Sequence, residues 1–222
     1  GGTPSLLKKA ELEMIIEALT TNFNLATHFE FTLEANPDDI NPVIAADWLA
    51  LGVNRLSIGI QSFQAGSLAW MNRAHTVEQS HEAIKIVQAA GFKDISADLI
   101  YGSPHLSDEN LMADIATLIQ YKVNHISCYA LTVEEKTALF SMIAKKQIED
   151  IDTTKQARQF EIMVDALTAA GFEHYEISNF AMPNGRSKHN SNYWNQVPYL
   201  GLGPAAHSFN GDQRQWNIAN NS

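Results

Sequence analysis

Four joints of one kind recur along the chain, and they constrain its fold more than any other feature. In each joint an apolar helical stretch ends, an apolar residue follows, two polar residues turn the chain, and a strand-like stretch begins. The joints occupy residues 52–57, 91–96, 122–127 and 171–176. Strands that alternate with helices of this length predict right-handed βαβ units and a parallel sheet. Periodicity alone does not decide between a barrel and an open, doubly wound sheet.

The order of the elements follows from hydrophobic periodicity and from helix end signals. We expect helices at residues 9–23, 41–51, 64–71, 76–90, 107–121 and 153–170. We expect strands at residues 28–33, 55–60, 95–101, 125–131 and 175–180, with a long polar loop before residue 153. Thr76 and Gln79 have the spacing of a capping box. Past Ala181 the periodic pattern ends.

Polar side chains stand where three of the expected strands end, namely Glu34, Gln61 and Asp98. Each of them alone is more often structural than functional. Three polar side chains at equivalent places together favour a functional site. They also favour a barrel over an open sheet, because a barrel builds its site from several strand ends and an open sheet binds a nucleotide in a single crevice. Carboxylates suit ribose hydroxyls or an ammonium group, whereas a transition metal would need histidines beside them.

Other candidate residues leave alternatives open. Arg73 is either a solvated loop cation or a forked donor for a ligand carboxylate. The turn formed by Gly1, Gly2 and Thr3 is either plain or lets the backbone approach a ligand closely. We expect His75 to make a hydrogen bond within its loop. Cys128, on an apolar strand, is expected to pack in the core.

A group of aromatic and polar side chains lies outside any expected periodic element: His189, Asn190, Tyr193 and Trp194. The aromatic rings either pin a loop to the body of the protein or grip a flat ligand. His189 is a possible iron ligand if that ligand is heme.

Composition excludes several function classes. A chain of 222 residues suits one domain, and the net charge of -10 argues against a nucleic-acid partner. No apolar run approaches the length of a membrane span. A single cysteine excludes a disulfide framework and is consistent with the cytoplasm. We expect no metal site made by this chain alone, and no nucleophile elbow of a hydrolase is present.

An ordered set of motifs resembles the radical S-adenosylmethionine proteins related to oxygen-independent coproporphyrinogen III oxidase, with the closer match to the heme chaperone subgroup. The motifs are Gly-Gly-Thr-Pro at residues 1–4, Glu-Ala-Asn-Pro at 34–37, Arg-Leu-Ser-Ile-Gly-Ile-Gln-Ser-Phe at 55–63, Asp-Leu-Ile-Tyr-Gly at 98–102, His-Tyr-Glu-Ile-Ser-Asn-Phe-Ala at 174–181 and His-Asn-Ser-Asn-Tyr-Trp at 189–194. Ser103 and Asn72 depart from the usual leucine and glycine of the family.

The resemblance implies an α/β fold, an incomplete (βα)6 barrel of parallel strands over residues 1–181 that lacks its first strand. Residues 182–222 would form an irregular extension leading toward a C-terminal domain. Residues that match positions lining S-adenosylmethionine in the family are Gly1, Gly2, Thr3, Glu34, Gln61, Arg73 and Asp98, with Arg73 on the carboxylate and Asp98 near the ribose. His189, Asn190, Tyr193 and Trp194 match the heme chaperone motif.

The family's three-cysteine motif for a [4Fe–4S] cluster would lie before Gly1, so we expect the chain to be a segment of a longer protein. Cys128 cannot replace three thiolates. We expect the segment to be catalytically inert, and the intact protein to bind heme as cargo for an acceptor protein. Two alternatives stay open: oxidative decarboxylation of coproporphyrinogen, or heme carriage that needs no cluster.

Overall fold

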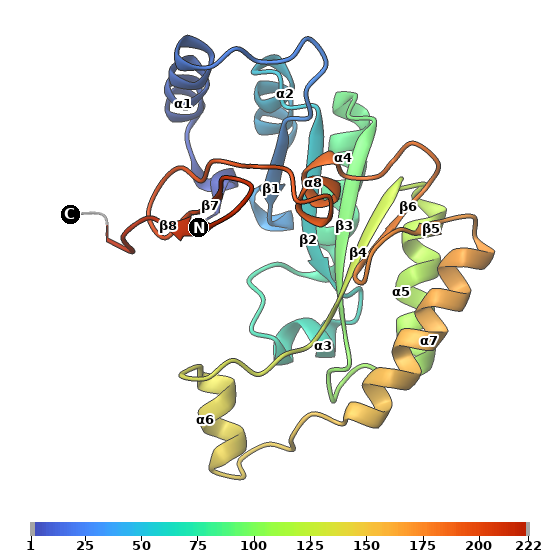
Figure 1. Cartoon of the computed structure of the whole chain (residues 1–222). Coiled ribbons are helices and arrows are strands. Elements are labelled where there is room, and N and C mark those ends of the chain that lie inside the picture. The colour runs from blue at the N-terminus through green and yellow to red at the C-terminus, as the bar shows by residue number, and fades with distance from the viewer. Residues whose placement is uncertain (1–2, 221–222) are drawn as a thin grey trace.

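One six-stranded sheet forms the centre of the computed structural model, which describes residues 3–220 (Figure 1). Its strands in spatial order are β1 (Thr32–Ala35), β2 (Arg55–Gln61), β3 (Asp94–Tyr101), β4 (His125–Ala130), β6 (Asn179–Ala181) and β5 (Glu173–His174). The pairs from β1 to β4 are parallel, whereas β6 runs antiparallel to both β4 and β5. The sheet and its helices form an incomplete barrel, as the family resemblance implies, but β6 departs from the expected parallel order.

Helices connect the parallel strands and cover one face of the sheet (Figure 1). The covering helices are α2 (Pro42–Ala50), α4 (Val77–Ala90), α5 (Asp108–Gln120) and α7 (Thr153–Ala169). Shorter or peripheral helices are η1 (Pro4–Leu6), α1 (Lys9–Asn22), η2 (Pro37–Asp39), α3 (Ala65–Trp70), α6 (Ala138–Ala144) and α8 (Lys188–Trp194). A separate hairpin joins β7 (His207–Phe209) to β8 (Arg214–Trp216).

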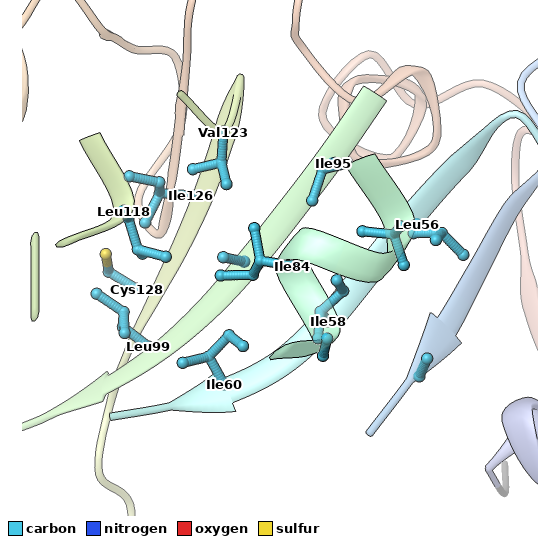
Figure 2. Packing of buried hydrophobic residues seen from close by; sticks show 14 of the residues in the cluster. Leu56, Ile58, Ile60, Ile84, Ile95, Leu99, Leu118, Val123, Ile126 and Cys128 are labelled. Atoms are coloured by element: carbon cyan, nitrogen blue, oxygen red, sulfur yellow. The ribbon is translucent and has the colours of Figure 1, made fainter. Parts of the chain in front are cut away.

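Alternation along β2 assigns its side chains to two environments. Leu56, Ile58 and Ile60 are fully buried beneath the helices, where they pack with residues such as Ile84 and Leu118 (Figure 2). Residues 55, 57 and 59 point to the opposite face, because successive strand residues alternate. β3 and β4 follow the same pattern, so the uncovered face of the sheet is polar.

Helix ends follow their sequence signals. The Thr76 hydroxyl accepts a hydrogen bond from the Gln79 backbone at 3.3 Å, and the Gln79 side chain accepts one from Thr76, which confirms the capping box. The Asn41 side chain caps α2. Gly91 ends α4 at a φ of 111°, a conformation in which glycine has no steric penalty.

Three predictions of regular structure are wrong. The strand predicted at 28–33 begins at Thr32, because the Asn54 side chain bonds the backbone of Phe29 and Phe31. The strand predicted at 175–180 is instead the hairpin of β5 and β6, with a turn in which the Glu176 carbonyl accepts a hydrogen bond from the Asn179 backbone. The loop predicted before residue 153 contains α6.

Residues 182–220 contain α8 and the β7–β8 hairpin, neither of which the sequence pattern predicts. The chain around residue 189 is helical because the Ser187 hydroxyl caps α8 through the Asn190 backbone. No helix among residues 3–220 is both long enough and apolar enough to cross a membrane.

The buried layer beneath α4 should carry much of the stability. We expect Ile84→Ala to lower the free energy of unfolding by about 2–5 kcal/mol, because it removes a fully buried side chain and leaves a cavity. Val43→Ala is the matched control, since Val43 is 70% exposed on α2 and should change stability by less than about 0.5 kcal/mol. Urea unfolding measures both, and equal effects would contradict the assignment of the core.

Candidate functional site

Two adjoining cavities open on the polar face of the sheet. The first, here called the strand-end cavity, has a volume of about 180 Å³ and is lined by Thr3, Pro4, Glu34, Ala35, Asn36, Ser57, Gly59, Gln61, Arg73 and Asp98. The second, here called the inner cavity, has a volume of about 440 Å³ and extends toward the starts of the strands. The two share Pro4, Glu34, Ser57 and Asp98.

The strand-end cavity gathers five of the residues that the sequence singles out: Thr3, Glu34, Gln61, Arg73 and Asp98. Thr3 directly precedes η1, and Arg73 lies in a loop. The other three residues lie on the successive strands β1, β2 and β3. Gly1 and Gly2, the other two of that group, lie outside the described residues. The structure therefore brings the described members of the set to one place.

Gln61 and Gly59 shape the end of β2. Gln61 has a φ of 65°, and the pairing register with β3 shifts between Ile58 and Gln61. A bulge of this kind re-aims a side chain at the end of a strand. A Cβ on Gly59 would lie 2.9 Å from Gln61 Nε2, so the Gln61 amide would have to shift, whereas its distance of 3.5 Å to Arg73 Nη2 is an ordinary van der Waals contact.

Asn36 holds Arg73 in the cavity. Arg73 Nη2 donates a hydrogen bond to Asn36 Oδ1 at 2.9 Å, while Arg73 Nε is buried without a partner among the described residues. Sequence reasoning names the Glu-Ala-Asn-Pro segment but gives Asn36 no role. The remaining donors of the guanidinium suit a planar anion such as a carboxylate.

Asp98 lies at the junction of the two cavities. Ser57 Oγ donates to Asp98 Oδ1 at 3.2 Å. Burial raises the pKa of Asp98 to about 6, against hydrogen bonds from the Ser127 and Ser57 hydroxyls that lower it, and the charge of Glu34 adds to the rise. A carboxyl group in this state can accept or share a proton with a ligand hydroxyl near neutral pH.

The inner cavity contains buried polar groups that the sequence analysis does not single out. His125 lies between two hydroxyls, with its Nδ1 2.7 Å from Ser96 Oγ and its Nε2 2.8 Å from Tyr175 Oη. Burial lowers the pKa of His125 to about 3, and the charge of Arg55 contributes. The imidazole is therefore neutral and fixed. The alternation of polar residues on β2, β3 and β4 is the sequence signal that could have revealed this cavity.

The four residues of the aromatic group divide into two pairs. His189 and Asn190 line the inner cavity. Tyr193 is outside the lining and packs its ring edge-on against His189 at 4.7 Å, while Trp194 Nε1 donates to Glu176 Oε2 at 3.0 Å. All four residues lie on α8, which contradicts the prediction of a stretch without periodic structure. Of the four, only His189 and Asn190 are placed to contact a ligand in the inner cavity.

Two other residues behave as predicted. His75 Nε2 lies 3.1 Å from the Ile60 carbonyl oxygen, a hydrogen bond that fixes the loop. Cys128 is buried among apolar residues on the covered face of the sheet (Figure 2), and burial raises the pKa of its thiol. Within the described part of the chain, no group of three or more histidine, cysteine, aspartate or glutamate residues could hold a metal ion.

The family model of the radical SAM superfamily matches residues 1–118. The chain belongs to the radical SAM superfamily. It is 37% identical over 218 residues to the heme chaperone HemW of Mycobacterium tuberculosis, covering 98% of this chain and 56% of that protein. It is 34% identical over 209 residues to heme chaperone HemW of Escherichia coli, covering 93% of this chain and 54% of that protein. This radical SAM chain thus spans about half the length of the curated relatives that it matches.

A solved structure agrees with the fold of this radical SAM chain. Coproporphyrinogen III oxidase (HemN) from Escherichia coli, described as a radical SAM enzyme, superposes with a TM-score of 0.81 at 23% sequence identity. The match covers 99% of this chain and 53% of that one. At this identity the likeness concerns the fold, and it supports the incomplete barrel.

The raised pKa of Asp98 predicts a pH-dependent stability difference. The contribution of Asp98 is fully present below pH 3.8 and is lost as pH rises through about 6, because the folded protein disfavours the carboxylate. Asp98→Asn avoids this loss. Above pH 6 it should therefore be more stable than the wild type by about 1–3 kcal/mol, and below pH 4 nearly equal.

Urea unfolding between pH 4 and 8, without added cofactor, measures this difference. Asp38→Asn is the control, because Asp38 is exposed and lines neither cavity. A stability difference that is independent of pH would show that Asp98 does not titrate in this range.

Proposed function

We propose that this chain is the central segment of a radical SAM heme chaperone that binds S-adenosylmethionine in the strand-end cavity. The observation that carries the proposal is the convergence of Thr3, Glu34, Gln61, Arg73 and Asp98 in one cavity of a radical SAM chain. The relatives named heme chaperone HemW support the second half of the proposal.

The chemistry of the cavity suits an amino acid joined to a nucleoside. The orphaned Nε of Arg73 and its forked donors suit the methionine carboxylate. Asp98 suits the ribose hydroxyls, and Glu34 and Thr3 offer acceptors for the ammonium group. These residues bind and orient the cofactor and exclude water from one side of it.

The described residues do not fit an iron–sulfur cluster, since their one cysteine is buried in the core. We propose that the cluster ligands lie outside this chain. The domain division follows the same proposal, with residues 1–181 as the partial barrel and 182–222 as the link toward a further domain.

Heme is proposed as cargo for an acceptor protein in the cytoplasm. His189 is exposed at the start of α8 and lines the inner cavity, so its imidazole can reach an iron that approaches from the cavity mouth. Tyr193 supports the ring of His189 edge-on. Trp194, tied to Glu176, is proposed to fix α8 rather than to touch heme.

The cofactor proposal is tested with Arg73→Lys in the intact protein. We expect S-adenosylmethionine to bind at least about tenfold more weakly, because lysine lacks the planar fork that pairs with a carboxylate. Arg158→Lys is the control, since Arg158 pairs with Asp108 at the surface. Equilibrium dialysis with labelled cofactor gives the affinities, and an unchanged affinity in Arg73→Lys would refute the assigned role.

The heme proposal is tested by titrating heme into the intact protein and following the Soret absorption band. His189→Ala should shift or abolish the band by removing the axial imidazole. His207→Ala is the control, because His207 lies on β7 and lines neither cavity. Identical spectra for His189→Ala and the wild type would exclude His189 as the ligand.

A further inference from the structure

The inner cavity contains a buried cation with no role in the proposed cofactor site. Arg55, at the start of β2, is 3% exposed and lines this cavity. Its Nη1 donates to the Gly185 carbonyl oxygen at 3.2 Å, whereas its Nη2 has no hydrogen-bond partner among the described residues. A buried guanidinium with a free donor is costly unless a ligand completes its hydrogen bonds.

The acidic neighbour of Arg55 balances its charge without satisfying its donors. Glu30 Oε2 lies 4.0 Å from Arg55 Nη1, beyond hydrogen-bond range. The Glu30 carboxylate is engaged elsewhere, because it accepts hydrogen bonds from the backbone of Lys188 at 2.9 Å and of His189 at 3.2 Å. Glu30 thus anchors α8, and it leaves the buried Arg55 Nη2 without a hydrogen-bond partner among the described residues.

We infer that Arg55 anchors a second binding site, one for a carboxylate group, at the inner end of this cavity. A forked guanidinium pairs with a carboxylate in a planar, bidentate geometry. The surrounding wall supplies hydroxyl groups from Ser96, Ser127 and Ser187, and the rings of Phe31 and Tyr129 provide surface for an apolar body behind the carboxylate.

The charged residues that line the inner cavity favour a carboxylate ligand and favour its binding at Arg55. Arg55 pairs in register with Asp94, so Asp98 lies four residues further along β3, about 13 Å along the strand. Glu34 pairs in register with Ser57, two residues beyond Arg55 along β2, and so lies between Arg55 and Asp98. The cavity therefore holds Arg55 beside Glu30 at one end, and Glu34 and Asp98 toward its junction with the strand-end cavity. These three carboxyl groups repel a singly charged carboxylate less than a doubly charged phosphate, which favours the carboxylate as the ligand of Arg55.

Two sources can supply the carboxylate: a free small organic acid, or a propionate arm of heme. The second source rests on the proposed function, and the first does not. The volume of about 440 Å³ suits a small molecule or one arm of a larger ligand that enters through the mouth.

Calorimetry on the intact protein tests the site with propionate and with propionamide, its neutral analogue. We expect propionate to bind and propionamide not to bind. Arg55→Lys should weaken propionate binding about tenfold, because it keeps the charge and loses the fork. Glu30→Gln should strengthen it about threefold, because the opposing charge is removed while the amide oxygen can still accept one of the two backbone hydrogen bonds from α8.

Matched controls are Arg158→Lys and Glu173→Gln, which alter exposed ion pairs outside both cavities. Circular dichroism checks the fold of each variant. If Arg55→Lys does not fold, the opposite-sign change in Glu30→Gln decides the outcome. Propionate that binds no better than propionamide, or equally to all folded variants, overturns the proposal.

The second arm compares heme with heme dimethyl ester, in which both propionates are neutral. Weaker binding of the ester, together with a matching loss in Arg55→Lys, assigns the site to a heme propionate. Equal binding of the two, with propionate still dependent on Arg55, supports the site and assigns it to a free acid. Absence of all heme binding would refute the chaperone proposal alone, since the propionate result stands apart from it.

Discussion

The packing of one sheet face against its helices is the interaction on which the rest of the structure depends. Leu56, Ile58 and Ile60 of β2 are removed from water beneath α4, and β3 and β4 contribute to the same layer. Because strand residues alternate, this burial fixes the direction of every second side chain on these strands. The polar residues on the other face are therefore held in place by hydrophobic packing behind them.

Hydrogen bonds fix the position of polar groups that the hydrophobic packing does not hold. Asn36 orients Arg73 at the strand ends, and Glu30 ties α8 across the starts of the strands. The two anchors act at opposite ends of one continuous depression, which the shared residues Ser57 and Asp98 join. A ligand at either end would thus contact groups whose positions are fixed independently of it, which lowers the entropic cost of binding.

Much of the barrel and one of its cavities could be predicted from local patterns. The joints, the capping box at Thr76 and the glycine stop at Gly91 are encoded within a few residues. The positions of Glu34 and Gln61 near the ends of β1 and β2 were predictable because parallel strands end at one edge of a sheet. The prediction that Asp98 ends a strand is wrong, since Asp98 lies inside β3 and the strand continues to Tyr101. The failures have two causes. The Asn54 side chain, 23 residues from Phe31, delays β1, whereas a local turn divides the predicted strand at 175–180 and forms the β5–β6 hairpin.

The sequence by itself determined the order of the βα units and named residues that line the strand-end cavity, such as Glu34, Gln61 and Asp98. Only the tertiary structure decided three further points. Arg55 is buried with one donor that has no partner within residues 3–220, Glu30 anchors α8, and His189 lines a cavity while Trp194 does not. The physical reason is distance along the chain. Periodicity fixes which face a side chain occupies, but Gly185, whose carbonyl accepts from the buried Arg55, lies 130 residues away along the chain, and its position depends on how the sheet curves.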